Sequence, residues 1–502
     1  MASQLAPASA DKRFFGHPLG LCTLFLTEMF ERFSYYGMRA LFSLYMTKAV
    51  VLGGLGFSDK KAGSIYALYT SMVYLMCLAG GWVADVFIGQ QRAVLAGGVF
   101  IALGEFCLFA PSDASFYSGL ALLMLGTGFL KGNVSTIVGQ LYQPGDPRRD
   151  SGFSIFYIGI NIGAIFSPIL CGAVGQHVYS DGKIGFRYGF ALAGFGMLLG
   201  IAQYLAQSKF LGNAGRRPVG TGSAEKDRLR KRNTIIAGLV ILAACAVVTV
   251  LGITGVIDVT PELVSDAEGY LLIGVSLAVF AWLIFGKGWT PQERKRATAI
   301  LVLFWSSAMF WASFEQAGSS LNLFADRSTR CVIFGWPFPS SWFQSSEAVF
   351  VVFLAPVFAW LWMALGKHNP STPAKFSLGL LFAALAFALM VPASKIAVGG
   401  VLVSTWWLNG TYLLQAFGEL CLSPVGLSAM TKLAPERAAG FIMGIWFLST
   451  SVGNWMAGKA GSLYSSMPLP TLFGTVAAIS MAGAIALALL IKPTVRLMAG
   501  AK

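Results

Sequence analysis

Three charged residues stand close together in the first long apolar segment of the chain. Glu28, Glu31 and Arg32 lie three and four positions apart or side by side, so a helix would place them on one strip of its surface. A carboxyl group held between a like charge and a cation can take up a proton and release it when its partner moves. All three histidines of the chain lie near predicted loops or segment ends, which leaves proton chemistry to the carboxyl groups.

Other charged residues interrupt apolar segments further along the chain. Lys131 in GTGFLKGNVS is flanked by small residues that allow another helix to approach. Glu315 in FWASFEQAGSS is an opposite charge in the second half, and we expect a Lys131–Glu315 or an Arg39–Glu315 pair to bridge the halves as a gate. Glu419 in AFGELCLSPVG stands between a glycine and a proline, so we expect a kinked stretch that lines a cavity.

The remaining charges in apolar segments carry weaker expectations. Glu105 is expected to be solvated or capped near an outer helix end, and Lys459 to extend its ammonium group to the membrane surface. Glu347 opens its apolar segment. Aromatic side chains near the charged positions are either packing residues or the lining of a site; they are Tyr35, Tyr36, Tyr69, Trp311 and Trp446.

The composition indicates a membrane protein. Charged residues make up 12% of the 502 residues, where a soluble domain has about 25%. Hydrophobic residues make up 56%, and a soluble protein of this composition would expose large apolar patches. The net charge of +14 comes from Lys and Arg in short loops rather than from a nucleic-acid-binding surface. Seven cysteines without a CxxC spacing indicate neither a disulfide framework nor a zinc site.

Fourteen apolar segments are long enough to cross a bilayer, for which about 20 residues are needed. Their predicted limits are 19–47, 61–84, 92–111, 115–142, 152–177, 187–206, 234–253, 269–286, 297–324, 344–366, 376–394, 403–431, 438–464 and 469–491. The seventh and eighth contain no predicted buried charge, and the acidic loop before the eighth is expected outside the cell. We interpret these two as an accessory hairpin between two six-helix halves.

Placing the N-terminus inside gives 24 Lys and Arg residues on the cytoplasmic side and 8 on the other, which agrees with the positive-inside rule. Both termini are therefore predicted to be cytoplasmic. The predicted parts are a cytoplasmic N-terminus (1–18), an N-terminal six-helix bundle (19–206), a basic cytoplasmic linker (207–232), an accessory hairpin (233–287), a C-terminal six-helix bundle (288–492) and a cytoplasmic tail (493–502).

Within lipid the charged trio of the first segment would be costly. A charge at the centre of a membrane helix costs about 2.5–3.5 kcal/mol, so three charges cost about 8–10 kcal/mol. Leu and Phe neighbours return only about 0.3–0.6 kcal/mol each. A lipid-facing position is therefore energetically unfavourable. Two interpretations remain. The trio is either a static network of ion pairs between packed helices, or part of an aqueous cavity that binds a polar substrate and protons.

Several stretches resemble the proton-dependent oligopeptide transporters of the major facilitator superfamily. EMFERFSYY, at 28–36, is similar to the family's ExxERFxYY motif. GGWVADVFIGQQRAV, at 80–94, resembles the loop between its helices 2 and 3, and FYIGINIGAIFSP, at 156–168, its helix 5. FEQAGSSLNLFADR, at 314–327, and the FQS…LAP pattern, at 343–356, resemble helices 7 and 8.

The resemblance implies an all-helical membrane protein with two six-helix bundles and an accessory hairpin, which imports di- and tripeptides with protons by alternating access. Arg32 and Lys131 would hold the peptide carboxylate and Glu419 its amino terminus. Glu28, Glu31 and Glu315 would couple protons, the only coupling ion and in place of any cofactor. The implied pocket lining consists of Tyr35, Tyr36, Tyr69, Asn161, Trp311, Trp446 and Glu347. The implied partners are the peptide and the lipid bilayer, with no nucleic acid, and the carrier would function as a monomer in the inner membrane.

One position departs from the family. Its members commonly have Asn-Pro in helix 8 where this chain has Glu347 and Ala348. A carboxyl group therefore stands in place of a neutral amide, and either changes selectivity towards amine-bearing ligands or points elsewhere.

Other classes of protein remain as alternatives. A membrane-embedded enzyme would need a nucleophile or a metal set, and the sequence has no HExxH, no GxSxG and no histidine at membrane depth. Two charge-bearing halves favour a rocking carrier over a channel or a receptor. Among carriers, the alternative substrate is another small polar solute such as nitrate or a peptide-like drug.

Overall fold

The computed structural model describes residues 11–143, 146–216, 218, 220, 223–435 and 438–498, and it is almost entirely helical. The α-helices are α1 (Leu19–Thr47), α2 (Asp59–Val83), α3 (Gln90–Phe109), α4 (Asp113–Gln140), α5 (Arg148–Gly175), α6 (Phe186–Gln207), α7 (Ala224–Ile253), α8 (Pro261–Phe285), α9 (Pro291–Phe314), α10 (Ser320–Ser328), α11 (Phe343–Ala364), α12 (Thr372–Val398), α13 (Thr405–Leu433), α14 (Ala439–Ser462) and α15 (Leu469–Leu497).

Short elements join these helices. The 3₁₀ turns are η2 (Val50–Leu52), η4 (Ser208–Leu211), η5 (Glu315–Gly318), η6 (Ser340–Trp342) and η7 (Gly366–His368), and η3 (Ala84–Ile88) is a π turn. Two pairs of very short strands complete the described structure. β1 (Thr329–Arg330) pairs in parallel with β4 (Val403–Ser404), and β2 (Val332–Ile333) pairs antiparallel with β3 (Trp336–Pro337).

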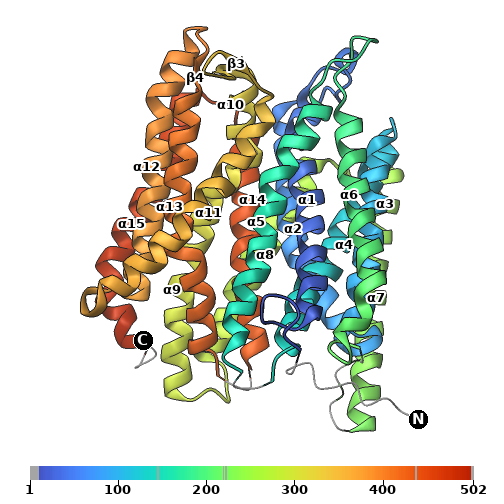
Figure 1. The fold of residues 1–502 in the computed structure, drawn as a ribbon, viewed down its shortest axis with the longest axis vertical. Coiled ribbons are helices and arrows are strands. Elements are labelled where there is room, and N and C mark those ends of the chain that lie inside the picture. The colour runs from blue at the N-terminus through green and yellow to red at the C-terminus, as the bar shows by residue number, and fades with distance from the viewer. Residues whose placement is uncertain are drawn as a thin grey trace. The chain divides into compact units, whose positions relative to one another are not determined.

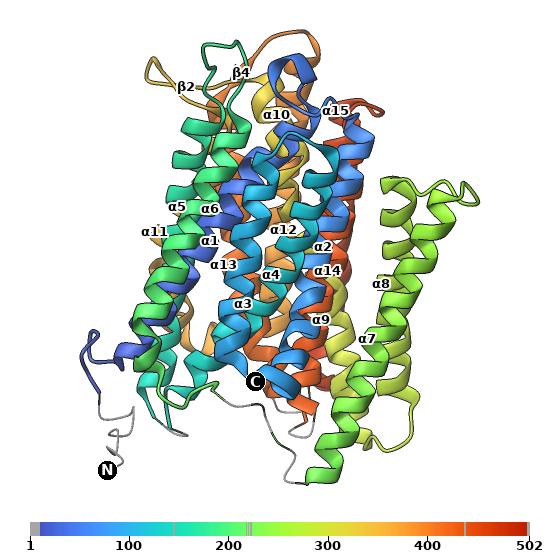
Figure 2. The same ribbon diagram turned by 90° about the vertical axis from the view of Figure 1, so that its right-hand side faces the viewer.

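The helices form two compact units. Unit 1 contains Met1–Met38, Leu75–Ser167 and Phe190–Val264, and unit 2 contains Arg39–Tyr74, Pro168–Gly189 and Ser265–Lys502. Helices α1, α2, α5, α6 and α8 therefore each contribute one part to each unit. Within each unit the long helices run side by side along the vertical direction of Figures 1 and 2. The predicted domain boundaries follow the order of the sequence and stay predictions.

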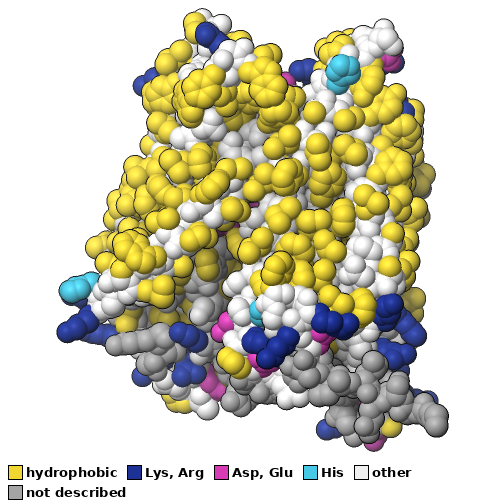
Figure 3. Space-filling model, in the orientation of Figure 1, with side chains coloured by type: hydrophobic (Ala, Val, Ile, Leu, Met, Phe, Trp, Pro, Cys, Tyr) yellow, Lys and Arg dark blue, Asp and Glu magenta, His cyan; other side chains and the backbone are white. Residues whose placement is uncertain are grey.

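Every predicted span corresponds to a helix. Within the described residues, twelve helical stretches are long and apolar enough to cross a membrane. The other two spans correspond to α1, which carries four charges, and to α14, which carries Ser, Thr and Asn residues. Helices satisfy their own backbone hydrogen bonds, as a bilayer requires. Figure 3 shows hydrophobic side chains covering the lengths of the helices on one face, with Lys and Arg gathered mainly near one end.

Most helix limits differ from the prediction by a few residues, and three of the differences involve charged residues. Helix α7 begins at Ala224, inside the predicted linker, because Glu225 and Asp227 favour a helix in its first turn. The predicted span 297–324 is interrupted, since α9 ends at Phe314 and η5 separates it from α10. Helix α8 begins at Pro261, eight residues before the predicted start, so it includes Glu268.

Small residues set the distance between helices in each unit. In unit 1, a Cβ atom on Gly97 of α3 would lie 2.6 Å from the carbonyl oxygen of Gly126 on α4, so the two backbones touch. In unit 2, a Cβ atom on Gly453 of α14 would lie 2.7 Å from the carbonyl oxygen of Ala308 on α9. Such contacts are typical of membrane helices, where backbone packing replaces the hydrophobic effect between helices.

Polar contacts hold the chain that leads into α1. Asp11 accepts a hydrogen bond of 3.0 Å from the backbone N–H of Leu19, which caps the first turn of the helix. His17 Nδ1 lies 2.9 Å from the Tyr142 hydroxyl, after the end of α4. Arg148 forms an ion pair of 2.8 Å with Asp146, and this contact lowers the pKa of the Asp146 carboxyl group. The start of α1 is thus fixed in unit 1.

Candidate functional site

The charged trio of α1 forms one buried group in unit 1, which we call the Arg32 cluster (Glu28, Glu31 and Arg32). The Arg32 guanidinium donates two hydrogen bonds to Glu31, one of them 2.5 Å long from Nη2 to Oε1. Its Nε also lies 3.4 Å from Glu28 Oε1. Glu31 is 0% exposed, Glu28 2% and Arg32 3%. One guanidinium therefore faces two carboxyl groups within the same two turns of helix.

The second oxygen of Glu28 accepts no hydrogen bond from the residues that the structure describes. Buried polar atoms in proteins are nearly always paired, and unpaired ones gather at functional sites. Because Glu31 takes both hydrogen bonds of the Arg32 guanidinium, Glu28 is the carboxyl group of the Arg32 cluster with free hydrogen-bonding capacity.

Aromatic rings and a glycine surround the Arg32 cluster. The guanidinium carbon of Arg32 lies 4.9 Å from the ring centroid of Tyr35 and 5.9 Å from that of Tyr36, both on α1. On α5, a Cβ atom at Gly163 would lie 2.8 Å from the Arg32 Cβ, so the glycine lets α5 contact α1 at this level. Asn161 is buried on the same helix and bonds the Tyr157 carbonyl oxygen at 2.9 Å.

Lys131 of α4 places a second cation near the Arg32 cluster. It is partly buried and lies close enough to Arg32, Glu28 and Glu31 to interact with them electrostatically. Gly132 and the other small residues around it leave room for neighbouring helices, as the sequence indicates. Unit 1 therefore gathers two cations and two carboxyl groups from α1 and α4.

The second arginine of α1 belongs to a different group in unit 2, the Arg39 cluster (Arg39, Tyr66 and Glu315). Arg39 Nη2 lies 2.8 Å from Glu315 Oε2 on η5. Its Nε donates to the Tyr66 hydroxyl at 3.0 Å, and that hydroxyl lies 3.3 Å from the Glu315 carbonyl oxygen. Arg39–Glu315 is one of the two pairs that the sequence suggested, and its role as a gate stays a prediction.

Gly318 makes the Arg39 cluster possible. A side chain at this position of η5 would overlap the Tyr66 hydroxyl and would lie 2.7 Å from Arg39 Nε. The end of α9 at Phe314 and the 3₁₀ turn that follows it thus place Glu315 and Gly318 against α1 and α2.

Two more predicted site residues, Glu347 on α11 and Glu419 on α13, lie together in unit 2. The two carboxyl groups lie close enough to interact electrostatically. Val351, Ala416 and Leu420 pack α11 against α13 next to them. Glu347 therefore lies near another predicted site residue, and its effect on selectivity stays a prediction.

The three remaining aromatic candidates lie in unit 2. Tyr69 of α2 is buried and its ring centroid is 5.3 Å from that of Phe42. Trp446 of α14 is 6% exposed and packs beside Phe376, with ring centroids 6.3 Å apart. Trp311 of α9 lies against Gly453, where an added Cβ would be 2.5 Å from the tryptophan Cβ. Their part in a pocket stays a prediction.

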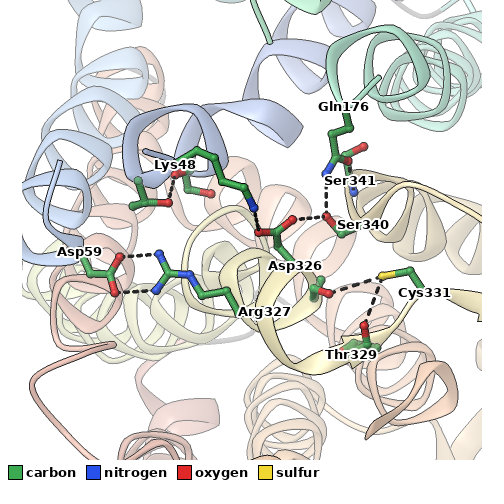
Figure 4. Close-up of polar contacts among 12 residues, drawn as sticks. Lys48, Asp59, Gln176, Asp326, Arg327, Thr329, Cys331, Ser340 and Ser341 are labelled. Carbon is green, nitrogen blue, oxygen red and sulfur yellow. Dashed lines mark hydrogen bonds and ion pairs between the residues drawn. The ribbon is translucent and has the colours of Figure 1, made fainter. Parts of the chain in front are cut away.

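One layer of ion pairs in unit 2 was not expected from the sequence. Both terminal nitrogens of Arg327 donate to the carboxylate of Asp59 at 2.8 Å (Figure 4). Lys48 Nζ, at the end of α1, lies 2.9 Å from Asp326 Oδ2. The adjacent residues of α10 therefore hold the end of α1 and the start of α2, and we call these four residues the Asp326–Arg327 layer.

A third helix end joins the same region. Gln176, just after α5, donates to the Ser340 hydroxyl at 2.9 Å and accepts a bond of 2.8 Å from the backbone N–H of Ser341 (Figure 4). Ser340 in turn donates to Asp326 at 3.3 Å. The sequence placed Lys48 and Arg327 in separate loops of the predicted outer side. Only the motif FADR, which continues the Glu315 stretch, could have pointed to their pairing.

Two expectations about isolated charges were wrong. Glu105 is 0% exposed, and the Ser34 hydroxyl of α1 donates to it at 3.0 Å. Glu268 is buried in α8 and bonds Ser71 of α2, so the hairpin does contain a buried charge. Lys459 is a different case, because its ammonium group lies 2.6 Å from Asp266, whose side chain is 47% exposed, so it does reach towards solvent. Each of these charges found a partner distant in sequence.

The comparisons with known proteins decide the family. A sequence model of the POT family matches residues 91–479. The chain belongs to the POT family. It is 39% identical over 500 residues to the peptide transporter YePEPT of Yersinia enterocolitica subsp. palearctica, covering 97% of this chain and 96% of that one. It is 35% identical over 500 residues to the di-/tripeptide transporter of Lactococcus lactis subsp. cremoris, with 97% and 98% covered.

A solved structure agrees with this assignment. The crystal structure of a peptide transporter POT in complex with sulfate has a TM-score of 0.91 and 40% sequence identity, and each chain covers 100% of the other. The resemblance inferred from the motifs is therefore confirmed. So is the fold class, an all-helical membrane protein with the major facilitator fold of this family of transporters.

Proposed function

We propose that the protein is a proton-coupled symporter that imports di- and tripeptides by alternating access. The observation that carries the proposal is the placement of charge within the membrane helices. Cations gather at Arg32 and Lys131 in unit 1, and a carboxyl pair, Glu347 and Glu419, lies in unit 2. A peptide is a zwitterion and needs one group of each kind. The named activity of the Lactococcus lactis relative supports this substrate class.

The two ends of the peptide would have different partners. Arg32 and Lys131 would hold the carboxylate, because a guanidinium and an ammonium group both donate strong charge-assisted hydrogen bonds. Glu419 would hold the amino terminus. The polar and aromatic side chains that line the proposed pocket are Tyr35, Tyr36, Tyr69, Asn161, Trp311, Trp446 and Glu347.

Proton coupling would fall on Glu28, Glu31 and Glu315, with no cofactor besides the proton. The Arg32 guanidinium cannot satisfy Glu31, Glu28 and a peptide carboxylate equally. Arrival of the peptide carboxylate would therefore loosen the Arg32–Glu31 contact and favour protonation of the carboxyl group. This competition ties substrate binding to proton uptake.

The Arg39 cluster would form the gate on the predicted outer side, with the Asp326–Arg327 layer behind it. Opening would separate Arg39 from Glu315 and Asp59 from Arg327. A proton on Glu315 would remove its charge and weaken the first of these pairs.

The protein would lie in the inner membrane with both termini in the cytoplasm and function as a monomer. It would have no enzymatic activity and no nucleic-acid partner. The excess of Lys and Arg in alternate loops supports this orientation.

Uptake of radiolabelled dialanine into proteoliposomes tests the proposal. An inward proton gradient should drive accumulation above equilibrium, and a proton ionophore should abolish it. N-acetylated dialanine and dialanine amide should each compete poorly, because each lacks one charged end. Absence of gradient-driven accumulation by a protein that still gives a cooperative thermal unfolding transition would overturn the proposal.

A further inference from the structure

One buried carboxyl group, on the accessory hairpin, has no part in the proposed peptide site. Glu268 of α8 is 4% exposed, and one of its oxygens contacts the hydroxyl of Ser71 on α2. Its other oxygen has no hydrogen-bond partner among the residues that the structure describes. An ionised carboxylate buried with a single hydroxyl partner would be costly, because most of its acceptor capacity would stay unsatisfied. The position therefore favours a neutral, protonated acid.

The contacts of the Ser71 hydroxyl lead to the same protonation state. Its Oγ lies 2.6 Å from the carbonyl oxygen of Ala67, one turn earlier on α2, and also within hydrogen-bond distance of Glu268. A hydroxyl has one hydrogen atom and can fill only one of these two close contacts as a donor. A carbonyl oxygen cannot donate, whereas a protonated carboxyl group can. A proton on Glu268 therefore satisfies both contacts.

Helix α8 contacts two other helices at this level. Towards α14, Trp455 Nε1 donates to the Ser265 carbonyl oxygen at 2.7 Å. A Cβ atom at Gly269, on the same helix, would overlap the Trp455 ring, so α8 and α14 are in close contact. Towards α2, the contact is the one between Glu268 and Ser71. Helix α8 is thus attached to both α2 and α14.

Helices α2 and α14 also pack directly against each other. Asn454 of α14 donates to the Thr70 carbonyl oxygen of α2 at 3.0 Å, and a Cβ atom at Gly458 would overlap Ala67. The two helices come from different halves of the sequence, so alternating access would separate them when this side opens. Helix α8 could not then keep its contacts with both. Because its close packing is with α14, the contact between Glu268 and Ser71 is the one that would break.

The charged groups on the elements packed against Glu268 are few. On α8 they are Glu262 and Asp266, and on α14 the charged residue is Lys459, which pairs with Asp266 at 2.6 Å. Between positions 62 and 83, α2 contains no Lys, Arg, Asp or Glu. The titratable side chains of that stretch are Tyr66, Tyr69, Tyr74 and Cys77. Since Lys459 already has a partner, burial and the contact with Ser71 decide the protonation of Glu268.

We propose that Glu268 is a further proton-binding site, at which a bound proton attaches the accessory hairpin to α2 and so holds α2 and α14 together. When the contact with Ser71 breaks, the Glu268 carboxyl group meets water, its proton passes to water, and the charged carboxylate then opposes return to the buried position. Acidic pH therefore favours the attached hairpin, and alkaline pH favours its release. The separation of α2 and α14 rests on the proposed function, whereas the proton site does not depend on the substrate.

Infrared spectroscopy of the purified full-length protein in detergent tests the proton site. Near neutral pH, exposed carboxyl groups are ionised, because their pKa values lie at about 4. A buried protonated acid still shows the C=O stretching band of a neutral carboxyl group. Glu268→Gln should remove one such band. Glu105→Gln is the matched control, since Glu105 is also buried and bonded to a serine, Ser34 of α1, and it should keep the band that Glu268→Gln removes.

Hydrogen–deuterium exchange of the backbone at 261–269 tests the attachment of α8. A rise in pH speeds intrinsic exchange equally in the wild type and in Glu268→Gln, so the difference between them reports release of the hairpin. A glutamine amide can donate to Ser71 at every pH. The wild type should therefore exchange about two- to tenfold faster than the variant at alkaline pH, the shift that one net hydrogen bond supplies, and equally fast at acidic pH.

A second variant covers the case in which Glu268→Gln does not fold. Ser71→Ala removes the partner on α2 but leaves the acid, so its 261–269 segment should exchange faster than that of the wild type already at acidic pH. Equal exchange of the two proteins at acidic pH would overturn the attachment.

The outcomes separate this inference from the proposed function. Survival of every neutral carboxyl band in a folded Glu268→Gln variant would overturn the proton site. The same pH dependence of exchange in the wild type and in Glu268→Gln would overturn the link between the proton and the hairpin. Neither measurement involves a peptide, so absence of gradient-driven dialanine uptake would overturn the proposed function alone.

Discussion

The two arginines of α1 stand two turns apart on one helix but satisfy their charges in different ways. Arg32 pairs with Glu31 and Glu28, which are its neighbours on the same helix. Arg39 pairs with Glu315, which comes from η5 in the other half of the sequence. The first contact moves with α1 as one piece, whereas the second joins two separate elements and can open when they part.

This difference assigns different tasks to the two clusters. A local cluster with two carboxyl groups and one cation retains an excess of acid in every position of α1. It is suited to hold a proton or to receive a substrate carboxylate. The Arg39–Glu315 ion pair can form only while α1 and η5 lie next to each other, so it can serve as a contact that opens and closes. The Arg32 cluster is thus a candidate binding and proton site, and the Arg39 cluster a candidate gate.

Replacing either arginine with alanine should cause the largest loss in the free energy of unfolding. Arg32→Ala leaves two buried carboxyl groups unpaired, and Arg39→Ala leaves one. Breaking a buried ion pair costs about 3–5 kcal/mol, so we expect about 5 for Arg32→Ala and about 3 for Arg39→Ala. Denaturant titration in detergent micelles measures both values. Equal losses of stability would mean that the contact with Arg32 does not stabilise the buried Glu28 carboxyl group.

Neutralising one partner carboxyl group should restore more of the lost stability in Arg39→Ala than in Arg32→Ala. In Arg39→Ala/Glu315→Gln no charge is left over, so the double variant should recover about 2 kcal/mol of the loss. In Arg32→Ala/Glu31→Gln the carboxyl group of Glu28 remains buried, so the recovery should be smaller. The same denaturant titration measures the coupling energies. Similar coupling energies in the two double-mutant cycles would contradict the distinction between local and distant pairs.

Two glycines offer a smaller and matched perturbation. Gly163→Ala would press a Cβ against the Met29 carbonyl oxygen, 2.5 Å away, beside Arg32. Gly318→Ala would press against the side chains of Tyr66 and Arg39, which can move. Overpacking costs about 1–3 kcal/mol, and we expect Gly163→Ala near the upper value and Gly318→Ala near the lower.

The glycine variants should also differ in function. Gly318→Ala disturbs the predicted gate and should change the rate of uptake more than the affinity for dialanine, whereas Gly163→Ala should weaken affinity. Uptake and binding assays on the two variants would show this. An unchanged uptake rate in Gly318→Ala would argue against a gating role for the Arg39 cluster.

The smallest expected effect concerns His17, at the start of the same helix but outside both clusters. Burial, with the positive charge of Arg148, lowers the pKa of His17 below its usual 6.5. The unfolded chain therefore binds this proton more readily than the folded protein. Stability should be unaffected by His17 above pH 6.5 and should fall as the pH drops below it.

Replacing His17 tests that pH dependence. His17→Asn removes the proton site, so the loss of thermal stability on acidification should be slightly smaller than in the wild type. The slope against pH is the relevant quantity, because the variant also loses the contact with Tyr142. An unchanged slope would show that His17 does not contribute.

Much of the fold and part of the candidate site could be predicted from the sequence, because its strongest signals are local. Apolar length located the helices, and the spacing of Glu28, Glu31 and Arg32 placed them together, since both depend on neighbours along the chain. Charges within apolar segments indicated Glu315, Glu347 and Glu419 in the second half, and the family motifs then suggested their roles. The partners of Glu105, Glu268 and Lys459 were missed because they depend on which helices meet.

The Asp326–Arg327 layer was missed for the same reason. Nothing in the spacing of Lys48, Asp59, Asp326 and Arg327 shows that α10 meets the ends of α1 and α2. The start of α8 was misplaced because its first turns are polar, and Glu268 became buried only through contact with Ser71. Long-range pairing of charges is a property of the packed helices and leaves little trace in a single sequence.

The variant Glu31→Gln tests the central claim most directly, because it keeps the shape of the side chain but cannot exchange a proton. Gradient-driven uptake and counterflow of dialanine are measured in the same proteoliposomes. We predict that counterflow persists while accumulation driven by the proton gradient is lost. Wild-type accumulation by Glu31→Gln would contradict the assignment of the Arg32 cluster to proton coupling, and equal loss of both activities would indicate a binding or folding role instead.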